Sequence, residues 1–499
     1  MPNQTGAAPF LSTRRGKLTL LLVCAVSLLD LLDATQLNIA LPSIERALRL
    51  SVTGLQWVPN AYLLTYGGFM LLGGRAADLI GRRRVLVTGI VTIGVSSLVG
   101  GLASSSGMLI GARLAQGLGA AMTMPAALSV LTTSFKEGKE RHAAFGVWGA
   151  VGGLGSAFGV IIGGVLTQGP GWRWVLFVNP IFAALLIAPV FRLVDAEHNR
   201  ARVHNFDAPG AVLATGGMLL LVYALVEAPT AGWGSARTLG EMLGAAALLC
   251  LFVINELRHR NPLAPLSIFK INGLGFSDVT QFTVMAGFLA TFFFLTLYMQ
   301  NVLHYSAIRT ALSYLPLCFA IGVAATASSQ LLSRIGTRAM IIAGAIVTAG
   351  GLYWLSRIPV HGSYVSDLLP GMLVFSFGIG PVFVAVTTAA NAGVSSDKAG
   401  LAAALLNASQ QLGGALGLAI LTVLATDRTR SLVSAHLPEA HALTAGFQRS
   451  LLVGSIFCLA AALVAIKATN TRGETEPQII EFPVETAGRR LATPATTTH

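Results

Sequence analysis

Long apolar runs, separated by short breaks, occupy most of the chain. Each run extends for about 20 residues without the strict apolar–polar alternation of a strand, which indicates helices long enough to span a membrane. Charged residues or clusters of Gly and Pro mark the breaks. The pattern predicts fourteen helices, near residues 18–40, 55–76, 85–104, 107–131, 143–167, 174–194, 208–228, 238–258, 275–302, 308–332, 339–357, 366–390, 399–425 and 448–467.

The composition agrees with a protein that is embedded in a bilayer. Of the 499 residues, 54% are hydrophobic and 11% are charged, whereas a soluble domain has roughly 25% charged residues. This excludes a soluble enzyme, a disordered chain and a protein with a single anchor. Outer-membrane barrels are excluded because their strands alternate in polarity. The four cysteines all lie in apolar runs, so neither a disulfide framework nor a metal site is expected: Cys24, Cys250, Cys318 and Cys458.

The distribution of Lys and Arg predicts the orientation. The first run is too long and too acidic for a cleaved signal, so it is read as a span. If the N-terminus is cytoplasmic and the loops alternate, the cytoplasmic segments hold 23 Lys and Arg and the outer segments hold 9, with Arg113 inside a span. This asymmetry predicts a multi-pass protein of a bacterial inner (plasma) membrane with both termini in the cytoplasm. A miscount of two spans would not disturb this alternation, so a total of twelve spans is the alternative.

An internal repeat predicts the domain organisation. Ile80-Gly81 after the second predicted span aligns with Ile335-Gly336 after the tenth, eight spans later. The fold class expected is therefore an all-α polytopic membrane protein with two six-helix halves and a two-helix insert. Its parts are a cytoplasmic N-terminus, an N-terminal half, the insert, a C-terminal half and a disordered cytoplasmic tail, at 1–17, 18–194, 208–258, 275–467 and 468–499.

Three charged residues inside the spans are the candidates for proton coupling. Asp30 and Asp33 lie three residues apart, on one face of the first helix. An intramembrane carboxylate costs a few kcal/mol to bury, so it usually faces the bundle interior and has a function. Arg113 in the fourth span can pair with the aspartates, and its movement would switch proton binding. A purely structural ion pair between these spans is the alternative.

The segment from Gly74 to Arg84 is predicted to be a cytoplasmic turn that acts as a gate. Asp78 lies between Gly74 and Gly81, where it can pair with Arg82 or Arg83 and form a clasp that breaks during rocking. The simpler interpretation is a positive-inside signal that stops the span.

Small and polar residues mark two further features. Gly155, Gly159 and Gly163 recur every four residues, and with Gly164 they predict tight packing at a seam between the halves or ordinary packing within the membrane. Aromatic residues of the span at 275–302, and polar residues of other spans, are candidates for a substrate cavity, although rings that face lipid or pack are the alternative. The cavity candidates are Asn38, Gln116, Phe288, Phe292, Tyr298, Asn407 and Gln410.

Four segments resemble motifs of one transporter family. Asp33–Pro42, Gly74–Arg84, Arg113–Ala121 and Trp172–Pro180 resemble, in this order, motifs of the major facilitator superfamily, in particular its 14-span drug:proton antiporter branch. In that family the arginine motif is linked to proton transfer. One departure is Gly159-Val160, where the family's antiporter motif has Gly-Pro, so this helix lacks the kink of a proline.

The resemblance implies a proton-coupled secondary exporter of small hydrophobic, possibly cationic, drugs or antibiotics. A proton-linked transporter of a metabolite is the alternative function. No phosphate-binding loop of the GxxxxGK[ST] kind is present, so neither a nucleotide nor another cofactor is expected. The histidines lie scattered in loops, which argues against a membrane-embedded enzyme. The expected partners are a drug-like molecule, protons and the lipid bilayer; nucleic acid is not expected, and the protein is expected to be a monomer.

Overall fold

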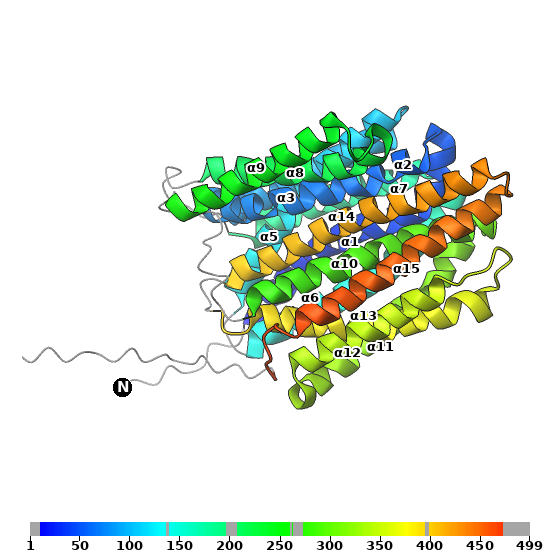
Figure 1. Cartoon of the computed structure of the whole chain (residues 1–499). Helices are drawn as coiled ribbons and strands as arrows, with labels where there is room; N and C mark the ends of the chain where they lie inside the picture. The colour runs from blue at the N-terminus through cyan, green and yellow to red at the C-terminus, as the bar shows by residue number, and fades with distance from the viewer. Residues whose placement is uncertain are drawn as a thin grey trace, which may run out of the picture.

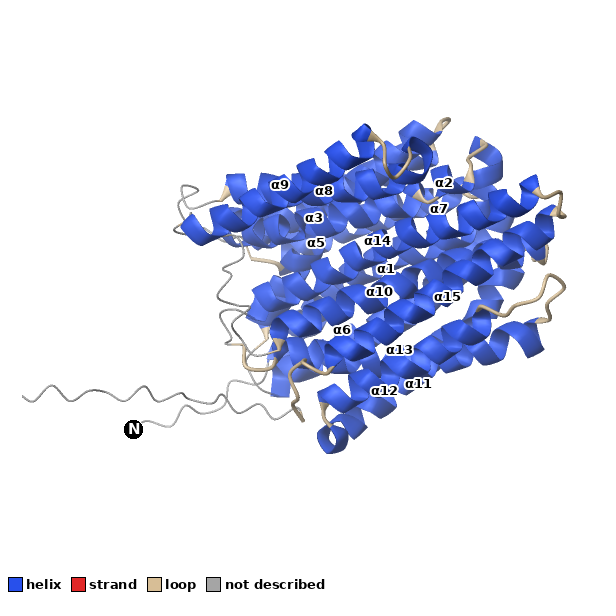
Figure 2. Ribbon diagram, in the orientation of Figure 1, coloured by secondary structure: helices blue, strands red, loops and turns tan. Residues whose placement is uncertain are grey.

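The computed structural model describes residues 10–135, 139–195, 207–259, 262, 273–394 and 399–472. These residues form long helices and no strand (Figure 2). The predicted tail at 468–499 lies largely outside the described residues. The fourteen long helices are α1 (Arg14–Leu48), α3 (Trp57–Ile80), α4 (Arg82–Gly101), α5 (Ser106–Ser134), α6 (Lys139–Gln168), α7 (Arg173–Leu193), α8 (Ala208–Ala231), α9 (Ala236–Arg258), α10 (Leu274–Leu297), α11 (Ala307–Ile335), α12 (Thr337–Leu355), α13 (Leu369–Asn391), α14 (Ala399–Ser434) and α15 (Glu439–Ala465).

Each predicted span corresponds to one of these helices. Short elements flank some of them: η1 (Phe10–Ser12), α2 (Val52–Leu55), and two π-helical turns, η4 (Tyr298–Val302) and η5 (Tyr364–Leu368). Among the described residues, eleven helices are long and apolar enough to cross a membrane by length and composition. The prediction of a polytopic all-α membrane protein with fourteen helices is therefore confirmed.

The helix–helix contacts of the first part of the chain, α1 to α7, recur in the second part, α10 to α15. In the first half α3 and α4 pack on α5, α1 packs on α6, and α4 packs on α7. In the second half the counterparts α11 and α12 pack on α13, α10 packs on α14, and α12 packs on α15. The halves meet where α3 packs on α14 and α6 packs on α11. α3 corresponds to α11, and α14 corresponds to α6, so a rotation that exchanges the halves turns one seam into the other. A repeat with a pseudo-two-fold axis requires this relation.

The two-helix insert lies at the side of this assembly (Figure 1). α8 and α9 pack on each other, and α8 packs on α3 and α14. The hydroxyl of Thr215 in α8 donates to the carbonyl of Gly68 at 2.8 Å, and the ring of Tyr223 lies 6.0 Å from that of Trp57. The insert therefore covers one seam between the halves from outside.

The repeated segment joins helices in the same way in both halves. α3 ends at Ile80 and α11 ends at Ile335, and each is followed by a glycine with positive φ: 104° at Gly81 and 82° at Gly336. Glycine suits this position because a side chain is strained there. The next helix begins at the residue that follows each glycine.

The prediction of a turn from Gly74 to Arg84 is wrong in its extent. Gly74 to Ile80 continue α3, so Gly81 alone breaks the helix. Arg82 donates to the hydroxyl of Thr133 in α5 at 2.7 Å, and Arg83 lies over the ring of Phe191 in α7 at 5.0 Å. Both contacts stay inside the first half. The side chain of Asp78 lies outside the described part of the chain, so the clasp stays a prediction.

The predicted glycine stripe lies mainly within the first half rather than at a seam between the halves. A Cβ atom added at Gly155, Gly159 or Gly163 would approach α1, at 2.8 Å from Leu28, 1.9 Å from Thr35 and 2.6 Å from Gln36, respectively. Gly164 faces the other way, where an added Cβ would lie 2.6 Å from that of Ala311 in α11. Adjacent residues point about 100° apart on a helix, so one helix serves both contacts. α6 runs without a break through Val160, as expected without a proline.

Gly163→Ala should destabilise the protein by about 1–3 kcal/mol, because the new methyl group meets backbone rather than a movable side chain. The added Cβ would lie 2.6 Å from the Cα of Gln36 and 2.7 Å from its carbonyl oxygen. Gly111→Ala is the matched control, since Gly111 is helical, exposed and has open space around it. Thermal unfolding in detergent should show a lower midpoint for the first variant only. Equal midpoints would mean that α1 and α6 are not this tightly packed.

Candidate polar site between the halves

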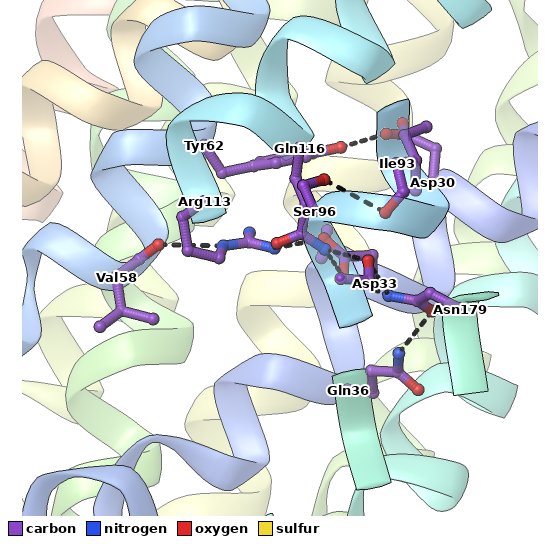
Figure 3. Close-up of polar contacts among 12 residues, drawn as sticks. Asp30, Asp33, Gln36, Val58, Tyr62, Ile93, Ser96, Arg113, Gln116 and Asn179 are labelled. Atoms are coloured by element: carbon purple, nitrogen blue, oxygen red, sulfur yellow. Dashed lines mark hydrogen bonds and ion pairs between the residues drawn. The ribbon is translucent and has the colours of Figure 1, made fainter. Parts of the chain in front are cut away.

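Asp33 of α1 accepts hydrogen bonds from two other helices of the first half, α5 and α7 (Figure 3). Arg113 of α5 forms an ion pair with its Oδ2 atom, and both side chains are buried. The other oxygen, Oδ1, accepts from the amide of Asn179 in α7 at 2.6 Å and from that of Gln116 at 3.1 Å. The charge of Asp33 is therefore balanced by one guanidinium and two amides, which is what a buried carboxylate needs.

Arg113 is fixed in place by further contacts. Its Nε donates to the carbonyl of Val58 in α3 at 3.1 Å, and its Nη1 also donates to Gln116 at 2.9 Å. The guanidinium lies 4.3 Å from the centroid of the Tyr62 ring, an arrangement that stabilises a desolvated cation. α3 comes this close because a glycine, Gly117, faces it: an added Cβ there would lie 2.2 Å from the carbonyl of Tyr62.

A second layer of polar groups orients the two amides that contact Asp33. The hydroxyl of Ser97 in α4 accepts from Gln116 at 2.5 Å and from Asn179 at 3.3 Å. Gln36, one helical turn beyond Asp33 on α1, donates to the side chain of Asn179 at 3.2 Å and to the carbonyl of Val175 at 2.8 Å. The network therefore connects α1, α4, α5 and α7, and a change at Asp33 reaches all four helices.

Asp30 has a different environment from Asp33. It is 8% exposed and accepts from the hydroxyl of Tyr62 and from that of Tyr66 at 3.2 Å. Among the described contacts, Arg113 pairs with Asp33 and does not hydrogen-bond to Asp30. Tyr62 has its hydroxyl on Asp30 and its ring against Arg113 (Figure 3). This one side chain therefore couples the two carboxyl groups.

A cavity lies beside the ion pair, between the two halves. It is partly open rather than enclosed, and the space of about 410 Å³ between its lining atoms includes open solvent. Its wall is mostly apolar, with Asn38, Tyr62 and Arg113 as the polar groups. Both halves line it, through Ala34, Leu37, Asn38, Pro59, Tyr62, Leu63 and Arg113 on one side and Leu289, Phe293 and Leu418 on the other. Apolar walls with few polar groups suit a small hydrophobic ligand.

The structure brings only some of the predicted cavity residues to this wall. Asn38 lines it, but Gln116 is buried in the Asp33 network behind it. Tyr298 was predicted to line the cavity and does not line the one described, since it is fully buried at the far end of α10 and its hydroxyl donates to Pro359. Asn407 bonds back to the carbonyl of Ala403, and Gln410 accepts from Gln281 at 3.2 Å.

Phe288 and Phe292 belong to an aromatic cluster of the second half. The ring of Phe288 stacks on that of Phe375 at 5.8 Å and meets that of Phe383 edge-on at 5.3 Å. The ring of Phe292 stacks on that of Tyr314 at 5.3 Å. Both phenylalanines are half-buried, and neither lines the cavity described above.

The halves touch near the Leu48 end of α1. There an added Cβ at Gly164 would collide with α11, as described above. Three hydrogen bonds cross between the halves in this region: Gln300 to the carbonyl of Ile39 at 3.0 Å, Asn301 to Glu45 at 3.2 Å, and the amide of Ile308 to Gln168 at 3.1 Å. These contacts hold the halves together at the Leu48 end of α1.

The sequence pattern did not identify several residues of the site. Tyr62 and Tyr66 lie four residues apart on one face of α3, and Asn179 lies within the quoted Trp172–Pro180 motif. Neutral polar residues are common in spans, so composition gives them little weight. Asp278 has a signal that the sequence alone carries, because it is an acid inside the span predicted at 275–302.

Comparison with known proteins identifies the fold and the family. The family model described as Major Facilitator Superfamily matches residues 23–418. The puromycin resistance protein pur8 of Streptomyces alboniger is 38% identical over 89% of this chain and 89% of its own length. The cephamycin export protein CmcT of Amycolatopsis lactamdurans is 35% identical over 87% of this chain and 90% of its own length.

Solved structures show the same fold at low sequence identity. A bacterial homologue of the human lysosomal transporter Spinster, in an inward-facing and occupied conformation, superimposes with a TM-score of 0.63 at 16% identity, over 91% of this chain and 97% of that one. The arrangement of the helices, the family model and the relatives agree with one another. The protein is a multi-pass membrane transporter and not an enzyme, and the chain belongs to the Major Facilitator Superfamily.

Proposed function

We propose that the protein exports small hydrophobic, drug-like molecules from the cell in exchange for protons that enter. The observation that carries this proposal is the buried Asp33–Arg113 pair at the wall of a largely apolar cavity between the halves. The cavity supplies a place for an apolar substrate. The pair supplies a group whose charge changes when a proton binds.

The contacts of Asp33 suggest how proton binding and substrate binding exclude each other. Protonation of Asp33 would cancel the negative charge and leave Arg113 with neutral acceptors, Val58 and Gln116, and the ring of Tyr62. The guanidinium would then be free to shift at the cavity wall, where substrate binds. Substrate that favours the ionised pair would expel the proton, as an exchanger requires.

The energy that a proton supplies is adequate for a carrier of this kind. One proton that crosses a membrane potential of 100 mV releases about 2.3 kcal/mol. Each 1.4 kcal/mol corresponds to a tenfold concentration ratio, so one proton supports a gradient of roughly 40-fold from the potential alone. Tight substrate binding is not needed for such a gradient.

The names of the relatives support export as the direction of transport. The charges of the loops support an orientation with cytoplasmic termini. One relative is named for resistance to puromycin and another for the export of cephamycin. The excess of Lys and Arg on the side of the N-terminus supports cytoplasmic termini. In that orientation the contacts near Leu48 join the halves on the outer side of the membrane. We infer that the state described receives substrate from the cytoplasm.

The protein should protect a bacterial host that lacks its own efflux pumps. Its expression should raise the inhibitory concentration of several apolar drugs, puromycin included, at least about fourfold. This is possible because one proton supports a gradient of up to roughly 40-fold. The matched control is the Asp33→Asn protein at equal membrane abundance, which should not protect. Protection against no compound of a broad panel, together with growth on a metabolite that the host cannot otherwise handle, would favour the alternative of a metabolite transporter.

A further inference from the structure

Asp278 is a buried acid to which the function proposed above gives no role. It lies in the second turn of α10 and is 6% exposed. Neither of its carboxylate oxygens has a hydrogen-bond partner among the described residues. Burial of an ionised and unpaired carboxylate costs several kcal/mol, whereas a neutral acid is far cheaper to bury. In this conformation the side chain therefore needs a proton.

Asp278 lies on the face of α10 that leads to the cavity. Asp278, Phe282, Met285 and Leu289 follow one another at spacings of four, three and four residues, so they form one stripe along the helix. Leu289 lines the cavity. With a rise of 1.5 Å per residue, Asp278 lies about 16 Å from the level of Leu289, toward the first turn of the helix.

The neighbouring groups on α14 are polar but uncharged. An added Cβ at Gly413 would lie 2.1 Å from the carbonyl of Phe282, so this face of α10 packs directly on α14. Gln281, one turn beyond Asp278, donates to Gln410 of α14, and its own Oε1 has no partner among the described residues. α14 has no charged side chain from Ala399 to Thr426.

Among the described residues, the other helices that pack on α10 place no cation against Asp278. α13 has no titratable side chain, and α15 has only the thiol of Cys458 between Arg449 and Lys467. Lys467 lies 5.8 Å from the ring of Phe276, two residues before Asp278 and thus on the opposite side of the helix. α1 contributes Asp30 and Asp33 at the cavity, of which Asp33 is already paired with Arg113.

We propose that Asp278 is a second proton-carrying carboxyl group, located in the second half of the transporter. It holds a proton in the conformation described and releases the same proton to water in a conformation that gives water access to its carboxyl group. One O–H bond forms on uptake and breaks on release, so no other reactant is needed. The inference rests on the proposed function, because it assumes that protons drive export. A proton fits better than a cationic substrate, since a side chain that is 6% exposed leaves no room for a larger ligand.

Infrared spectroscopy of the purified full-length protein in lipid vesicles tests whether Asp278 holds a proton, with no need for a substrate. The C=O stretch of a protonated carboxyl group should be present in the wild-type protein and should lose one component in Asp278→Asn. Asp427→Asn is the matched control, because it makes the same change at an exposed carboxyl group of α14. Asp278→Glu should retain a component at a shifted frequency, which separates loss of the acid from loss of the fold. An identical C=O band in wild type and Asp278→Asn would overturn the proposal.

Proton transport per substrate tests whether this group takes part in the cycle. If two carboxyl groups each carry one proton, Asp278→Asn should move about half as many protons per molecule of ethidium as the wild type, while Asp427→Asn keeps the wild-type ratio. If the wild-type protein exports ethidium against a gradient and Asp278→Asn keeps the wild-type ratio of protons to ethidium, the inference about Asp278 is overturned and the proposed function stands. If the wild type does not couple any substrate to protons, the proposed function fails, and the infrared result still decides whether Asp278 holds a proton.

Discussion

Asp33→Asn should leave the protein in the membrane and lower uphill export by about tenfold or more, since a carboxyl group that relays protons cannot be replaced by an amide that does not titrate. The amide keeps the size of the carboxyl group. Asp33 accepts at both oxygens, from Arg113 on one and from Gln116 and Asn179 on the other. An asparagine accepts at one atom only, so the network also loses one contact. The measurement is uptake of a fluorescent dye by energised inverted vesicles at several pH values, normalised to the amount of protein.

Asp30→Asn provides the contrast to this variant. Its contacts are the neutral hydroxyls of Tyr62 and Tyr66, so the Asp33–Arg113 pair survives. We expect uphill export to persist with a shifted pH optimum or a narrower range of substrates. Wild-type transport in Asp33→Asn, at every pH, would move the coupling group to Asp30 or elsewhere.

Arg113→Met should destabilise the protein by about 3–5 kcal/mol, because it leaves the buried carboxylate of Asp33 without its cation. The double variant Asp33→Leu/Arg113→Met should recover most of this loss, since apolar groups of similar volume often replace a buried ion pair without cost. Neither variant should export. Arg113→Lys should also be impaired, because an ammonium cannot make the separate contacts to Val58, Asp33 and Gln116 that the guanidinium makes.

Thermal unfolding in detergent, combined with dye transport, distinguishes a coupling role from a structural one. Recovery of stability without recovery of transport in the double variant is the expected outcome. Recovery of both would show that the pair is only a structural link between α1 and α5, which is the alternative left open by the sequence. A single variant as stable as the wild type would mean that the carboxylate is not buried against the guanidinium.

The sequence predicted the helices well because the bilayer imposes a simple rule. A span needs about 20 apolar residues, and the breaks between runs are marked by charge or by Gly and Pro. The pseudo-symmetric repeat was readable from Ile80-Gly81 and Ile335-Gly336, since both glycines have the positive φ that ends a helix abruptly. Asp33 and Arg113 were also readable, because charged groups in spans are rare and costly.

The contacts within the site were less predictable. The spacing of Asp30 and Asp33 placed both on one face of α1, but it did not show that Arg113 pairs with Asp33 and that the tyrosines of α3 bind Asp30. Such contacts depend on the rotation of each helix about its axis, which a uniformly apolar run does not reveal. For the same reason the pattern left open whether the stripe through Gly159 lies at a seam between the halves or packs elsewhere within the membrane, and the structure shows that it packs on α1.

Proton movement driven by substrate is the most direct test of coupling at Asp33. Vesicles that contain the purified transporter, a trapped pH-sensitive dye and a high internal concentration of a transported drug are diluted into drug-free buffer. If drug and proton exchange at this site, the outflow of drug should acidify the interior in wild type. Asp33→Asn should acidify it by about half as much per drug molecule or less, because only the proton carried by Asp278 remains. Outflow of drug from the wild-type vesicles with no change in internal pH, or equal acidification in both proteins, would contradict the account.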